Sequence, residues 1–99
     1  MIFNEPIFVN QDIVFREEED GAFLFNPDTG DLKCLNPIGS VIWRLCDGSL
    51  SMREIKGKIT SRYSRIDPET IHGELESFLG ELFDIGYIAH QVSGFPESL

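Results

Sequence analysis

The dipeptide Asn36-Pro37 most constrains what this chain can fold into, because it separates two kinds of sequence pattern. Asn is a favoured helix N-cap, and Pro suits the first helical position, where its missing N–H is not needed. Short β-favouring runs and turns precede this dipeptide, and apolar residues at helical spacing follow it. The sequence therefore predicts strands first and helices afterwards, in a chain of 99 residues that is long enough for one small domain.

The residues before Asn36 predict a three-stranded antiparallel meander. Its strands are expected at 13–16, 22–25 and 31–35. Residues 17–21 form an acidic turn, and residues 26–30 combine Asn, Pro, Asp and Gly in a strong turn signal. Residues 7–9 are interpreted either as a further short strand or as an extended lead-in.

The residues after Asn36 predict three helices. The first ends at Asp47-Gly48, and residues 47–50 are expected to be a short loop. Ser51 and Glu54 have the spacing of a capping box for the second helix. Asp67 and Pro68 offer a cap and a first residue for the third helix, which Gly86 ends. Residues 87–90 are expected to return as a short extended segment.

Together these elements predict one α+β domain over residues 1–99. The expected fold is a winged helix-turn-helix, in which an N-terminal three-stranded antiparallel β-meander precedes three α-helices and a short terminal strand. The core is expected over about residues 12–90, with 91–99 as a flexible tail.

The formal charge of −9, from 17 acids and 8 bases, disfavours nucleic acid as a partner. A basic run at 53–65 keeps a winged-helix DNA-binding regulator as an alternative, although the third helix has acids and no Lys or Arg from 67 to 84. No apolar run approaches the ~20 residues of a membrane helix. We expect a cytoplasmic protein without membrane association, because no secretion signal or cysteine framework is seen.

The chain lacks the motifs of an enzyme: no phosphate-binding loop and no nucleophile with an adjacent base is present in the sequence. His72 and His90 could bind zinc with Cys34 and Cys46 only if the fold gathered all four. We therefore expect no catalysis, no cofactor and no metal. Cys46 is expected to be a small buried hydrophobe.

The meander should have open edges with unpaired N–H and C=O groups. An extended peptide from another chain could add there as a fourth strand. Two alternatives remain open at this point: the edge pairs with a second copy in a homodimer or docking subunit, or the protein's own tail covers it.

Residues 31–39 (DLKCLNPIG), 42–45 (IWRL) and Asp47-Gly48 resemble the PqqD-like peptide chaperones. Residues 52–55, 78–82 and 86–88 also fit that family, so the resemblance covers about residues 12–90. It implies a winged-helix element that binds the leader of a ribosomally synthesised precursor peptide. It also implies a modifying enzyme as partner, such as a radical S-adenosylmethionine enzyme, in quinone-cofactor synthesis or in another peptide pathway.

The resemblance places the leader between the third strand and the third helix. On the strand it implies Leu32, Lys33, Cys34 and Leu35. On the helix the contacts are chosen from a larger set, Ile71, His72, Leu75, Glu76, Phe78 and Leu79. Within that set we expect the flank with His72, Glu76 and Leu79, next to Phe83, to contact the leader. Asn36 and Trp43 are expected to act as helix cap and core residue, and the acidic helix suggests a leader with Lys or Arg opposite it.

Overall fold

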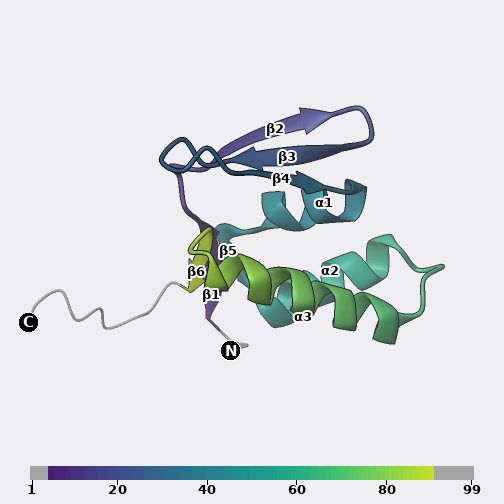
Figure 1. The fold of residues 1–99 in the computed structure, drawn as a ribbon. Helices are drawn as coiled ribbons and strands as arrows, with labels where there is room; N and C mark the ends of the chain where they lie inside the picture. The colour runs from purple at the N-terminus through teal and green to yellow at the C-terminus, as the bar shows by residue number, and fades with distance from the viewer. Residues whose placement is uncertain (1–4, 91–99) are drawn as a thin grey trace, which may run out of the picture.

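The computed structural model describes residues 5–90, which form two three-stranded antiparallel sheets and three helices (Figure 1). One sheet has the order β2 (Val14–Glu18), β3 (Gly21–Phe25) and β4 (Leu32–Leu35). The other has the order β5 (Asp47–Ser51), β1 (Pro6–Val9) and β6 (Ile88–His90). The helices are α1 (Pro37–Leu45), α2 (Met52–Arg62) and α3 (Pro68–Asp84). The α+β winged-helix arrangement with an N-terminal meander is thereby confirmed.

The β2-β3-β4 meander follows the strands that the sequence predicts. Between β3 and β4, Asn26 N–H donates to the carbonyl of Asp31 at 3.0 Å, and Gly30 closes the turn at φ +81°. The first turn is tighter than expected, because Glu17 and Glu18 pair with Ala22 and Gly21. The acidic residues therefore extend β2 and leave only Glu19 and Asp20 to turn the chain.

Two of the three predicted helix caps are confirmed. Asn36 Oδ1 accepts from Gly39 N–H at 2.7 Å. Ser51 and Glu54 form the capping box, with backbone–side-chain distances of 2.9 and 3.3 Å. Asp67 occupies the N-cap position of α3 as expected, but its side chain makes no cap hydrogen bond. At that end α3 has Pro68 at its first position and an acid in its first turn instead.

The loop expected at 47–50 is wrong, because these residues form β5 and pair with β1 (Figure 1). Their Asp, Gly and Ser composition favours a turn locally, but β1 supplies backbone partners from a distant part of the chain. Residues 7–9 are thus a strand rather than a lead-in. In β1, Ile7 pairs with His90 of β6, so the expected extended return at 87–90 is confirmed.

The core lies between the meander, the helices and the second sheet. Trp43 of α1 is buried and stacks on Phe15 of β2 with ring centroids 6.2 Å apart, which confirms its packing role. Helix α1 covers one face of the meander (Figure 1). On the opposite face, Leu32 keeps 59% of its surface exposed and Val14 keeps 44%.

Within residues 5–90, no helix has the length and apolar character needed to cross a membrane. The flexible tail expected at 91–99 lies outside the described residues.

Candidate functional site

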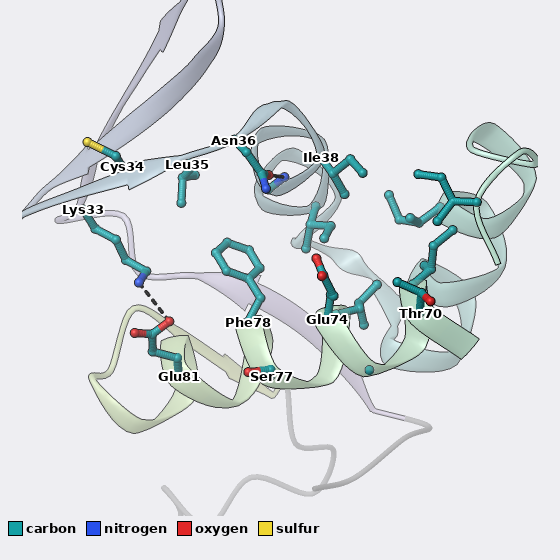
Figure 2. Close-up of a pocket in the computed structure, with 17 residues that line it drawn as sticks. Lys33, Cys34, Leu35, Asn36, Ile38, Thr70, Glu74, Ser77, Phe78 and Glu81 are labelled. Atoms are coloured by element: carbon teal, nitrogen blue, oxygen red, sulfur yellow. Dashed lines mark hydrogen bonds and ion pairs between the residues drawn. The ribbon is translucent and has the colours of Figure 1, made fainter. Parts of the chain in front are cut away.

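A groove of about 610 Å³ lies between β4 and α3 (Figure 2). Its polar rim comes from Lys33 and Cys34 on β4 and from Glu74, Ser77 and Glu81 on α3. Its floor is apolar and is lined by residues of β4, α1, α2, α3 and the α2–α3 connection: Leu35, Ile38, Ile42, Ile59, Ile66, Ile71, Leu75 and Phe78. The groove therefore combines an apolar interior with hydrogen-bonding and charged margins.

Strand β4 is an edge strand and pairs only with β3 among the described residues. The hydrogen bond from Asn26 N–H to the Asp31 carbonyl makes these two residues a hydrogen-bonded pair, which continues the β3–β4 ladder. Backbone groups alternate in direction along an antiparallel strand, so the N–H and C=O of Leu32 and Cys34 point away from β3. These groups form a free hydrogen-bonding edge beside the groove.

The side chains of β4 divide between the two faces of the sheet. Lys33 and Leu35 stand opposite Leu24 and Ala22, which are buried, and therefore share the inner face. Leu35 is itself buried, whereas Lys33 reaches from this face toward α3. Leu32 and Cys34 alternate with them on the outer face, and Cys34 meets the groove along the strand edge.

Helix α3 forms the second wall of the groove. In Figure 2, Phe78 projects from α3 toward Leu35, and Glu74 extends across the groove toward α1. At one end, Lys33 Nζ lies 2.9 Å from Glu81 Oε1 and connects the two walls. Phe78 is half-buried and Glu74 is exposed, so both remain accessible from the groove.

The structure brings six of the residues expected at the site together in the groove: Lys33, Cys34, Leu35, Ile71, Leu75 and Phe78. Of these, Ile71 and Leu75 are buried and line its floor. Leu32, His72, Glu76 and Leu79 do not line it.

The flank of α3 expected to contact the leader faces α2 instead of the groove. Glu76 Oε2 lies 2.6 Å from Lys56 Nζ, and His72 Nε2 lies 3.5 Å from Thr60 Oγ1. Leu79 has no exposed surface and belongs to the core. Helix α3 thus packs this side against α2 and leaves the opposite flank, with Glu74, Phe78 and Glu81, open to the groove.

Sequence reasoning missed Glu74, Ser77 and Glu81 as groove residues. A usable signal existed, because Glu74, Phe78 and Glu81 follow the i, i+4, i+7 spacing of one helix face. Choosing that face required knowing which side of α3 packs on α2. The contributions of Ile59 and Ile66 to the floor likewise depend on how the helices pack.

The titratable groups with clear pKa shifts lie outside the groove. The hydrogen bond and charge of Lys56 lower the pKa of Glu76, and burial raises the pKa of the Cys46 thiol to about 12. Cys46 is buried and donates to the carbonyl of Ile42 at 3.3 Å, which confirms its structural role.

Residues 5–90 contain no group of three or more His, Cys, Asp or Glu side chains placed to hold a metal ion. The groove itself offers a free strand edge and an apolar floor.

The meander, the three helices and the open strand edge define a winged-helix domain of the PqqD-like type. The family model described as coenzyme PQQ synthesis protein D (PqqD) matches residues 21–88, and the chain belongs to this family. The match includes β4, α1 and the whole of the groove-lining helix α3 together with its C-terminal connection.

The fold is also similar to a solved structure titled "TbiB1 in Complex with the TbiA(beta) Leader Peptide". The two chains share 26% sequence identity with a TM-score of 0.69. The similarity covers 89% of this chain and 96% of that one. No curated protein matches this chain.

Proposed function

We propose that this protein binds the leader segment of a ribosomally synthesised precursor peptide and presents it to a modifying enzyme. The observation that carries the proposal is the free edge of β4 beside the apolar groove. Membership of the PqqD family and similarity to a protein solved with a leader peptide support it. The protein acts as a recognition element without catalysis of its own, and a radical S-adenosylmethionine enzyme is one partner consistent with this family.

The leader binds by adding a strand to β4. Its backbone pairs with the outward N–H and C=O groups of Leu32 and Cys34, which bind a main chain of any sequence. Alternate leader side chains enter the groove and lie against α3. The groove extends along α3 from Thr70 to Glu81, a helical rise of about 16 Å, which equals the length of about five extended residues.

The expected affinity follows from the apolar floor. Burying two or three apolar leader side chains contributes about 1.5–3 kcal/mol each. Ordering the peptide and losing its translational freedom offset much of this gain. A dissociation constant near 1 μM, about −8 kcal/mol, is the expected result.

Hydrogen exchange monitored by NMR tests strand addition. The probe is a synthetic leader segment, taken from a short precursor peptide that is to be sought among the genes beside this protein's gene. We expect it to slow exchange of the Leu32 and Cys34 amides, because these donors become paired. The amides of Lys33 and Leu35 should change much less, since they already point toward β3.

Two substitutions of one residue provide the matched binding test. Cys34→Pro removes an outward N–H and should abolish binding, while the β3–β4 ladder persists because Pro is tolerated at an edge. Cys34→Ala keeps that N–H and should bind like the wild type. Equal affinities of the two folded variants in titration calorimetry would overturn strand addition at this edge. Sedimentation over a concentration series distinguishes a monomer from a dimer that already occupies the edge.

A further inference from the structure

We propose that the groove selects leader segments in which a Lys or Arg lies two residues from an apolar side chain. Glu74 binds the cation, and Phe78 packs against the apolar side chain. This inference rests on the proposed function and deepens it, because it states which peptides the groove prefers and which residues make the choice.

The first step is the charge balance of the groove. Three charged side chains line it: Lys33, Glu74 and Glu81. Lys33 and Glu81 neutralise each other at 2.9 Å. Within residues 5–90, Glu74 takes part in no ion pair or hydrogen bond through its side chain. The groove therefore holds one negative charge without a counter-charge, and it favours a cation on the bound segment.

The second step is that no other acid on α3 serves this role. Glu76 lies on the opposite flank and is engaged by Lys56 at 2.6 Å. Glu69 in the first turn and Asp84 at the last position of α3 do not line the groove. Glu74 extends across the groove, in the direction of α1 (Figure 2).

The third step is the spacing between charge and apolar surface. Phe78 follows Glu74 by four positions, a rise of about 6 Å along the helix. Side chains at i and i+2 on one face of a strand are about 6.6 Å apart. Figure 2 shows Glu74 and Phe78 one after the other along α3, with Leu35 across the groove from Phe78. A strand added along α3 therefore places one side chain near Glu74 and the next one on that face near Phe78 and Leu35.

The fourth step is the far end of the groove. Beyond Phe78, the Lys33–Glu81 pair presents no net charge to the peptide. The charge preference should consequently appear at one leader position only. Because Glu74 is exposed, its pair with the leader should change affinity by about two- to fivefold, and added salt should weaken it.

Peptide display tests the selection rule without knowledge of the natural leader. A random 12-residue library on phage is selected against the full-length wild type, Glu74→Lys, Glu69→Lys and Cys34→Pro. Groove binders are defined as sequences that Cys34→Pro fails to retain. Circular dichroism checks that each variant is folded. Glu69→Lys makes the same change of charge on the same helix, outside the groove.

We expect wild type and Glu69→Lys to enrich Lys or Arg two residues from an apolar residue. Glu74→Lys should enrich Asp or Glu at that same position. One enriched peptide and its Lys→Gln analogue, compared by fluorescence anisotropy at low and high salt, should differ two- to fivefold at low salt only.

Groove binders whose charge preference ignores Glu74→Lys would overturn the selection rule and leave leader binding intact. Selection without any sequence that depends on the β4 edge would overturn the proposed function together with the rule.

Discussion

Lys33 Nζ on β4 and Glu81 Oε1 on α3 lie 2.9 Å apart, so one ion pair connects the two walls of the groove. The side chain of Lys33 is 25% exposed and that of Glu81 is 58% exposed. Water screens charges at such exposure, and their attraction must also offset the ordering of two flexible side chains. The pair is therefore better suited to setting the charge at the groove's end than to holding the fold together.

From this we predict that Lys33→Met and Glu81→Gln each change the free energy of unfolding by less than about 1 kcal/mol. Urea denaturation of both variants and of the double variant measures the coupling energy. A coupling of about 2 kcal/mol or more would contradict a weak, solvent-screened pair.

Leu79 and Phe78 are neighbours on α3 with opposite roles. Leu79 has no exposed surface, so Leu79→Ala should cost about 2–5 kcal/mol of stability. Phe78 lines the groove, so Phe78→Ala should weaken leader binding tenfold or more with a smaller loss of stability. Chemical denaturation and calorimetry on the folded fraction measure the two effects. If Leu79→Ala lowers affinity more than Phe78→Ala in folded protein, these roles are reversed.

Gly21 starts β3 at φ +151°, and a Cβ there would overlap the carbonyl oxygen of Leu35. Gly21→Ala should therefore destabilise the meander by about 2 kcal/mol or more, through steric overlap and an unfavourable φ. Gly57 on α2 is the control, because a Cβ there meets nothing within 4 Å. Gly57→Ala should stabilise by about 0.5–1 kcal/mol, since Ala favours the helix. Equal thermal midpoints for the two variants would argue against this account.

The two cysteines should differ sharply in reactivity. Burial raises the pKa of the Cys46 thiol to about 12, so almost no thiolate exists there at pH 8. Cys34 is exposed on β4. Iodoacetamide should therefore modify Cys34 in the native protein and reach Cys46 only after unfolding. Peptide mapping by mass spectrometry identifies the site, and native labelling of Cys46 would show that α1 opens.

The Lys56–Glu76 pair between α2 and α3 should make stability depend on pH. Lys56 lowers the pKa of Glu76 in the folded protein below its ordinary value of 4.5. The stabilisation is thus complete above that ordinary value and is lost as pH falls through the lower folded value. Glu76→Gln removes this contribution. The difference in thermal midpoint between Glu76→Gln and the wild type should be largest near neutral pH and shrink below pH 4.5. A difference that stays constant with pH would contradict a coupling between Glu76 protonation and stability.

Local signals in the sequence were sufficient for the meander and the helix starts. The strand side of the groove was implied by the family resemblance, and three of its four residues, Lys33, Cys34 and Leu35, line the groove. Asn36 and Ser51 each cap a helix by accepting a hydrogen bond from a residue three positions later. These caps therefore depend little on the rest of the fold. The turn at 26–30 is equally local, because Asn26 bonds to Asp28, Gly30 and Asp31. Pairing β3 with β4 then leaves β4 at the edge.

Two features could not be predicted because distant residues decide them. Strand β5 has the composition of a turn and becomes a strand only through β1, some 40 residues earlier. The flank of α3 that faces the groove depends on Lys56 and Thr60 of α2, which contact the opposite flank. Helical periodicity identifies the buried apolar stripe of α3, but it does not distinguish the flank that packs on α2 from the flank that faces the groove.

The pairing of Ile7 with His90 places the first and last described strands side by side in one sheet. A short designed linker from β6 to β1 would close this part of the chain into a ring. New ends could then be opened at the exposed hairpin around Asp28, on the other sheet. The domain is accordingly a good candidate for circular permutation and for insertion into a surface loop of another protein.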